Sequence, residues 1–163
     1  QEPYLFSRTL AENIALGGGN AEIEDIKEAA GTASLLETIE SFKEGFETTV
    51  GERGVTLSGG QKQRTAIARM LIGKSPIMVF DDSLSAVDAE TDAKIRKGLL
   101  EKGKNSTVII ISYRITTLMA ADNILVLDKG RLVESGTHDE LIKNTGIYRK
   151  IYDIQSVALN YEE

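Results

Sequence analysis

The chain has 163 residues, the length of one ordinary domain, and 25 acidic against 19 basic side chains give a formal net charge of −6. This balance argues against binding driven by overall positive charge, so we expect no nucleic-acid partner. The absence of cysteine excludes disulfide scaffolds and cysteine zinc sites, and a single histidine excludes a site built from several histidines. Because the chain opens at Gln1 without an initiator methionine, we expect it to be part of a longer protein.

The first half of the chain has the apolar spacing of helices. A capping-box pattern at Thr9 predicts a short helix, which the glycines at 17–19 are expected to end. Helical spacing continues over residues 21–42, with an interruption predicted near Gly31, and returns over residues 58–73. This half is therefore expected to be a helical domain.

In the second half of the chain, the spacing of apolar residues changes from that of helices to that of strands. Short continuous apolar runs, typical of strands buried on both faces, occupy residues 77–80, 108–111 and 124–127. Residues 89–101 and 147–158 are predicted to be helical, and Lys129-Gly130 predicts a hairpin turn. Strands that alternate with helices indicate an α/β fold with a parallel sheet. We therefore expect two domains, residues 1–73 and residues 74–163.

The segment Leu57-Ser58-Gly59-Gly60-Gln61 has the features of an anion-binding helix start. Ser58 is a favourable N-cap, and the two glycines allow a ligand to approach the backbone closely. The positive end of the following helix and its free N–H groups would face an anion. An ordinary loop-to-helix junction with an N-cap is the alternative interpretation.

Two adjacent carboxylates, Asp81 and Asp82, follow the first apolar run. The carboxyl end of a buried parallel strand is where a ligand of a Mg²⁺-nucleotide lies in a nucleotide-hydrolysing sheet. The second carboxylate could orient or deprotonate an attacking water molecule. Alternatively, the pair simply ends the strand in a turn.

Taken together, these segments resemble the motifs of the ATP-binding cassette (ABC) ATPases, in the order and spacing of that family. The matching segments are the signature motif at 57–61, the Walker B strand and catalytic carboxylate at 77–82, the D-loop at 85–88, the switch loop at 111–114, the Q-loop glutamine Gln1, and an exporter-type X-loop at 49–54.

The resemblance implies a P-loop NTPase (RecA-like) core, here partial, together with an ABC α-helical subdomain. It implies an ATPase that uses ATP and Mg²⁺ and drives an exporter from the cytoplasmic face of the cell membrane. Its expected partners are a second nucleotide-binding domain and a transmembrane domain fused upstream. The phosphate loop of the family, GxxxxGK[ST], is expected before Gln1, so we expect the chain alone to be inactive.

The resemblance also assigns roles to individual residues. Asp81 and Gln1 would serve the Mg²⁺ ion, and Gln1 would also sense the γ-phosphate. Residues 58–61 would clamp the γ-phosphate of the opposite ATP site in a dimer, and Asp88 would couple the two sites.

Two residues differ from the family pattern, and the resemblance places both of them next to the γ-phosphate of this chain's own ATP. Asp82 replaces the usual glutamate, whose longer side chain polarises the attacking water, and a misplacement of ~1 Å can cost ~10²-fold in rate. Tyr113 replaces the switch histidine; with an ordinary pKa of ~10 it donates a hydrogen bond but accepts a proton poorly. The resemblance thus points to the degenerate half of a heterodimeric exporter, whose intact signature motif completes a competent site with a different chain.

Two other functions remain open at this stage. The chain could be a non-catalytic dimerisation module that completes the ATP site of a partner. It could also be a soluble ABC ATPase, although the X-loop-like segment and the acidic charge argue against that. Residues 4–6 either meet the membrane domain or pack beneath the helical subdomain.

Overall fold

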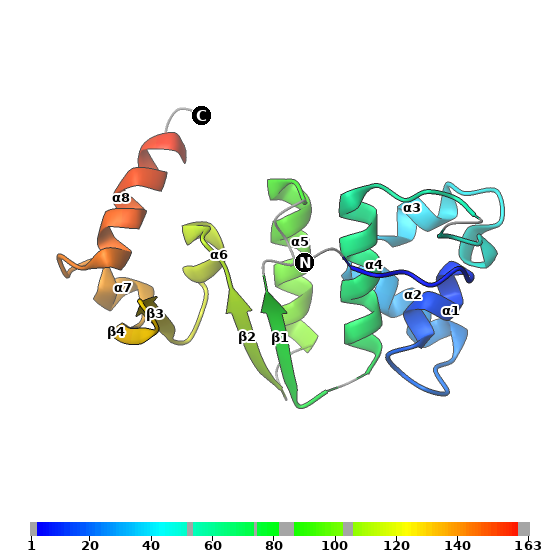
Figure 1. Ribbon diagram of the computed structural model, residues 1–163, viewed down its shortest axis with the longest axis horizontal. Helices are drawn as coiled ribbons and strands as arrows, with labels where there is room; N and C mark the ends of the chain where they lie inside the picture. The colour runs from blue at the N-terminus through cyan, green and yellow to red at the C-terminus, as the bar shows by residue number, and fades with distance from the viewer. Residues whose placement is uncertain (1–2, 52–53, 74, 82–86, 103–105, 160–163) are drawn as a thin grey trace. The chain divides into compact units, whose positions relative to one another are not determined.

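The computed structural model describes residues 3–51, 54–73, 75–81, 87–102 and 106–159. The chain divides into two compact units, residues 1–109 and residues 110–163 (Figure 1). The division expected after residue 73 stays a prediction. Within the described ranges, no helix has both the length and the apolar character needed to span a bilayer.

The first unit begins with helices and continues into a strand–helix–strand segment, as the sequence predicts. Its elements are α1 (Leu10–Ala15), α2 (Ile23–Thr32), α3 (Leu36–Glu40), the 3₁₀ helix η1 (Gly45–Glu47), α4 (Gly59–Ile72), β1 (Ile77–Asp81), α5 (Ala89–Lys102) and the start of β2 (Thr107–Ile111).

The predicted capping box at Thr9 is confirmed. The Thr9 hydroxyl accepts a hydrogen bond from the Glu12 N–H at 3.1 Å, and the Glu12 carboxylate accepts one from the Thr9 N–H at 3.0 Å. These reciprocal bonds satisfy two N–H groups that a helix start leaves without partners. The start of α1 is therefore encoded within four residues of sequence.

The interruption predicted near Gly31 lies three residues later. Gly31 is inside α2, and Ser34 adopts the left-handed conformation with φ of 52°. The N–H of Leu35 donates to the Ala30 carbonyl at 2.8 Å, and that of Ser34 donates to the Gly31 carbonyl at 3.0 Å. These two bonds form a Schellman motif, in which serine takes the position usually held by glycine.

The helix α4 is the centre of packing in this unit, because it contacts both α1 and α2. The buried side chains at this junction are Leu10, Ile14, Ile26, Ala29, Ala30, Ile67, Ala68 and Leu71. At the end of α1 the chain approaches α4 so closely that a Cβ atom on Gly17 would lie 1.7 Å from the carbonyl oxygen of Arg69. Only glycine fits at this contact.

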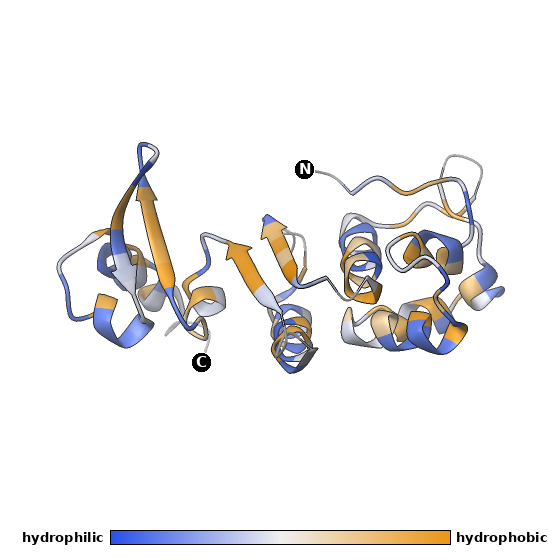
Figure 2. Cartoon of the chain, turned by 90° about the horizontal axis from the view of Figure 1, so that it is seen from below, coloured by the Kyte–Doolittle hydropathy of each residue, from blue (hydrophilic) through white to orange (hydrophobic). Residues whose placement is uncertain are grey.

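The strands β1 and β2 pair in one sheet and run in the same direction (Figure 1). In β1, Met78 and Phe80 are buried, whereas Ile77 and Val79 are 61% and 55% exposed. The prediction that this strand is buried on both faces is therefore wrong for the described chain. It is wrong also for the runs at 108–111 and 124–127, where Ile109, Ile111, Leu125 and Leu127 are exposed. The strands are apolar along most of their length (Figure 2), but α5 lies beside β1 on one side, and the side chains that alternate with the buried ones stay uncovered.

The second unit is built on an antiparallel hairpin. Its elements are the end of β2, α6 (Ile115–Leu118), β3 (Ile124–Asp128), β4 (Arg131–Gly136), α7 (His138–Leu141) and α8 (Ile147–Leu159). The predicted turn is confirmed: Lys129 and Gly130 have φ of 48° and 75°, the positive values that a type I′ hairpin requires at both central residues.

A small apolar core holds the second unit together. Ile115, Ile124, Leu141 and Tyr148 are buried side by side. The Tyr148 hydroxyl lies 2.8 Å from Nδ1 of His138, so the only histidine of the sequence anchors α7 to α8. The core draws one residue from each of α6, β3, α7 and α8.

Two glycine-to-alanine substitutions should have opposite effects on the stability of the first unit. Gly17→Ala places a methyl group against the α4 backbone and should lower the free energy of unfolding by about 1–3 kcal/mol. Gly31→Ala adds a Cβ in open space within α2 and should raise it by about 0.5–1 kcal/mol. Urea unfolding followed by circular dichroism measures both changes. Equal shifts in the same direction would contradict the close approach at Gly17.

Candidate functional site

The start of α4 is a capped helix terminus formed by the residues predicted to bind an anion. Ser58 has extended backbone angles, and its hydroxyl accepts a hydrogen bond from the Gln61 N–H at 3.3 Å. The Gln61 side-chain oxygen in turn accepts one from the Ser58 N–H at 2.9 Å. The predicted N-cap is confirmed, and Gln61 completes a capping box that the sequence analysis did not identify.

The first turn of α4 is open to solvent. Leu57 is buried and anchors the approach to the helix, whereas Ser58 and Gly59 are exposed. A Cβ atom on Gly59 would meet no atom within 4 Å. The N–H groups of Gly59 and Gly60 precede the first intrahelical hydrogen bonds, so the helix supplies no acceptor for them. With 14 residues of aligned peptide dipoles behind it, this terminus suits a phosphate oxygen.

Asp81 is the last residue of β1 and lies on its exposed side. This is the predicted position, at the carboxyl end of a parallel strand. The neighbouring candidates Asp82 and Gln1 lie outside the described residues. Within the described ranges, no group of three or more His, Cys, Asp or Glu side chains could hold a metal ion. A single carboxylate still fits Mg²⁺, which commonly takes one or two carboxylates together with phosphate oxygens and water.

Asp88 caps the helix α5 in the same way that Ser58 caps α4. Its Oδ1 atom accepts a hydrogen bond from the Thr91 N–H at 2.9 Å. The hydrogen bonds from Thr91 lower the pKa of the Asp88 carboxyl below 3.8, and the positive charge of Arg64 on α4 lowers it further.

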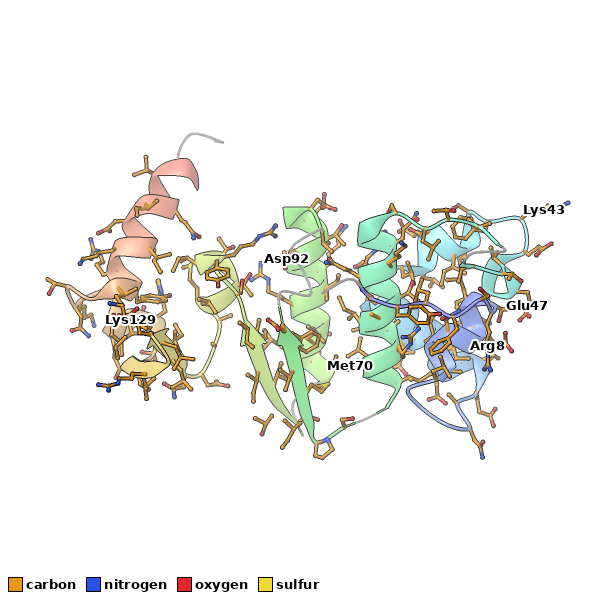
Figure 3. The ribbon with its side chains drawn as sticks, in the orientation of Figure 1. Arg8, Lys43, Glu47, Met70, Asp92 and Lys129 are labelled. Carbon is orange, nitrogen blue, oxygen red and sulfur yellow. The ribbon has the colours of Figure 1, made fainter. Side chains whose placement is uncertain are left out.

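Asp92 is a buried carboxylate near this site that the sequence analysis missed. It lies one turn after Asp88 on α5 and is 2% exposed (Figure 3). Its Oδ2 atom accepts hydrogen bonds from Nε and Nη2 of Arg96, both at 3.0 Å. Its Oδ1 atom is buried without a hydrogen-bond partner among the described residues. The spacing of four residues between an acid and an arginine on a helix was the available signal.

Tyr113, the residue at the switch position, belongs to the second unit. Its side chain is 82% exposed, and its carbonyl accepts a hydrogen bond from Nε2 of Gln155 at 2.7 Å. The Gln155 side-chain oxygen accepts a second bond, from the Ile115 N–H, at 2.9 Å. One glutamine on α8 therefore fixes the backbone on both sides of Arg114, and the phenol projects into solvent.

The cap at Asp88 predicts a pH-dependent local structure. A depressed pKa means that the bond to the Thr91 N–H is fully present above the ordinary value of 3.8 and is lost as the pH falls through the lower folded-state value. The amide resonance of Thr91 should therefore titrate with a midpoint below 3.8. Asp88→Asn keeps an acceptor oxygen and should abolish the titration. A midpoint at or above 3.8 in the unaltered chain would contradict the capping role.

Comparisons with known proteins agree with this arrangement of motifs. The family model described as ABC transporter matches residues 1–85. The uncharacterized ABC transporter ATP-binding protein YfiB of Bacillus subtilis (strain 168) is 48% identical over 155 residues, which are 95% of this chain and 27% of that protein. YgaD of the same strain, an ATP-binding/permease protein named for multidrug export, is 43% identical over 157 residues, or 96% of this chain and 27% of its own length.

A solved structure extends the likeness to three dimensions. The structure of a bacterial Atm1-family ABC exporter with ATP bound matches 95% of this chain with a TM-score of 0.88 and 39% sequence identity, and the match covers 27% of that chain. The chain therefore spans about a quarter of the length of the relatives it matches. Its fold is part of the α/β P-loop NTPase domain, and the chain belongs to the ABC transporter family.

Proposed function

We propose that this chain is part of the ATP-binding cassette of a membrane exporter, in which it couples ATP binding and hydrolysis to transport. The observation that carries the proposal is the exposed, capped first turn of α4, where Gly59 and Gly60 of the signature sequence present N–H groups for which the helix supplies no acceptor. The relative named for multidrug export and the Atm1-family exporter support transport out of the cytoplasm. The cassette would lie at the cytoplasmic face of the membrane, next to a transmembrane domain of the same protein.

Different residues of the chain would serve the ATP of a partner domain, the Mg²⁺ ion and the link between the two ATP sites. Residues 58–61 would contact the γ-phosphate of the ATP held by a second nucleotide-binding domain, since the N–H groups of Gly59 and Gly60 have no acceptor in the helix and Ser58 and Gly59 are exposed. Asp81 serves the Mg²⁺ ion of this chain's own nucleotide, together with Gln1. Asp88, whose charge is stabilised by Thr91, communicates between the two sites.

The two substitutions at the γ-phosphate support an asymmetric dimer. Asp82 is one methylene shorter than glutamate, and Tyr113 presents an exposed phenol where an imidazole would accept a proton. Both weaken hydrolysis at this chain's own ATP, while the signature motif that serves the opposite ATP is intact. The partner is therefore a different chain that supplies the glutamate and the histidine.

A non-catalytic dimerisation module is the second candidate. The exposed phenol of Tyr113 favours it, since a phenol lacks the imidazole nitrogen that would accept a proton at the switch position. In this case the chain completes the ATP site of its partner and hydrolyses nothing itself.

The role of the α4 terminus is tested by a charge placed where the phosphate would bind. Gly59→Asp adds a carboxylate in open space at the first turn of a helix, a position that favours acids, so the fold should persist. The carboxylate should repel the γ-phosphate and lower ATP turnover of the complete exporter by about 10²-fold or more, which is the usual cost of losing one such contact. The matched variant Gly59→Ser adds bulk without charge and should lose less activity than Gly59→Asp. Equal turnover for both variants would count against phosphate binding here.

The degenerate site is tested by restoring the family residues. Asp82→Glu combined with Tyr113→His should raise ATP turnover at this site by about 10²-fold, because the water-polarising carboxylate regains its reach. Single-turnover hydrolysis by the complete protein measures the gain. An unchanged rate would favour the non-catalytic module. Turnover at about 10 s⁻¹ by a homodimer of the unaltered protein would exclude the asymmetric dimer.

A further inference from the structure

A fully buried asparagine on α1 holds the segment that follows the Q-loop position. Asn13 is 0% exposed. Its Oδ1 atom accepts a hydrogen bond from the Phe6 N–H at 2.9 Å, and its Nδ2 group donates to the carbonyls of Phe6 and Thr9, both at 3.0 Å. One side chain thus satisfies backbone groups at both ends of residues 6–9 and fixes their path.

Arg69 joins this network from α4, 56 residues along the chain. Its Nε atom donates to the Asn13 carbonyl at 2.8 Å, and Nη2 donates to Oδ1 of Asn13 at 3.0 Å. Nη1 donates to the carbonyl of Tyr4 at 3.0 Å. The guanidinium carbon also lies 6.0 Å from the centre of the Phe6 ring. A planar fork of donors makes all three bonds at once, which the single ammonium of lysine cannot reproduce.

The hydrogen bonds among Arg69, Asn13 and residues 4–9 are partly buried, so breaking them would leave polar groups without water or protein partners. Burial lowers the pKa of the Arg69 guanidinium, although an arginine stays charged in a protein at neutral pH. The backbone of Arg69 is fixed as well, because Gly17 packs directly on its carbonyl oxygen. Residues 4–9, the end of α1 and the last turns of α4 are therefore held together at one place.

The same helix carries the signature motif at its other end. Ser58 caps α4, and Arg69 lies 11 residues later, about 16 Å along a helix that rises 1.5 Å per residue. Because the helix is continuous between the two positions, a displacement of its first turn can be passed along it to Arg69.

We propose that the hydrogen bonds from Arg69 to Asn13 and to the Tyr4 carbonyl transmit movement between the signature turn at residues 58–61 and the segment at residues 4–9. Arg69 and Asn13 are positioning residues, because they act through the backbone of residues 4–9. The inference rests on the proposed function, since it requires ATP to act on the signature turn. It adds a route by which that event reaches the segment directly after Gln1, without passing through β1 or the Mg²⁺ site.

Hydrogen exchange in the complete protein tests this route, with Mg²⁺-ATP as the probe. In the unaltered protein, ATP should slow exchange in a peptide covering residues 57–65 and in a peptide covering residues 4–9, each by about fivefold or more, the lower range for coupled sites. In Arg69→Lys, which keeps the charge and removes the fork, protection should persist at residues 57–65 and disappear at residues 4–9. Asn13→Ala, which removes the Oδ1 atom that accepts from Nη2 of Arg69 and from the Phe6 N–H, should give the same pattern.

A control arginine separates transmission from general loosening. Arg149 donates to the Ile142 carbonyl at 2.6 Å and to Asp153 at 2.7 Å, so Arg149→Lys removes comparable bonds within the second unit. It should leave ATP protection at both peptides unchanged. Protection of residues 4–9 that survives in both Arg69→Lys and Asn13→Ala would overturn this inference alone. An unaltered protein in which ATP protects neither peptide would overturn the proposed function and this inference together.

Discussion

The first unit depends on a helix, α4, whose first turn is exposed while its later turns are buried. Its first turn must stay exposed so that the N–H groups of Gly59 and Gly60 remain available, while Ile67 and Leu71 must be buried against α1 and α2. The capping box between Ser58 and Gln61 resolves this conflict, because it stabilises the exposed end without help from tertiary packing. The helix can therefore offer unbonded N–H groups at one end and pack in the core at the other.

The same division between local and distant interactions explains what the sequence could predict. The helix start at Thr9, the cap at Ser58 and the turn at Lys129-Gly130 each depend on residues within four positions of one another, and each is where the pattern indicates. The order of motifs along the chain likewise sufficed to identify the family. An α/β fold with helices first follows from apolar periodicity, whereas the resemblance to the family indicates that the core is partial.

The features that were missed or misplaced depend on distant partners or on context. The link from Arg69 to Asn13 spans 56 residues, and no periodicity reveals it. The break after α2 was expected near Gly31, whereas the Schellman bonds place the left-handed conformation at Ser34. An apolar run shows that a strand has a side to bury, but not how many of its faces are covered, so the exposure of Val79 could not be foreseen.

The hydrogen bonds that join Glu134 to α8 have a consequence for the order in which the second unit forms. The carboxylate of Glu134, on β4, accepts the backbone N–H of Ile147 and of Tyr148 at the start of that helix. A Cβ atom on Gly146 would overlap the same carboxylate. Since Glu134 is positioned by its pairing with Val126, the first turn of α8 acquires its partner only after the hairpin has closed. Folding of this unit should thus proceed from the hairpin outward, with the terminal helix docking last.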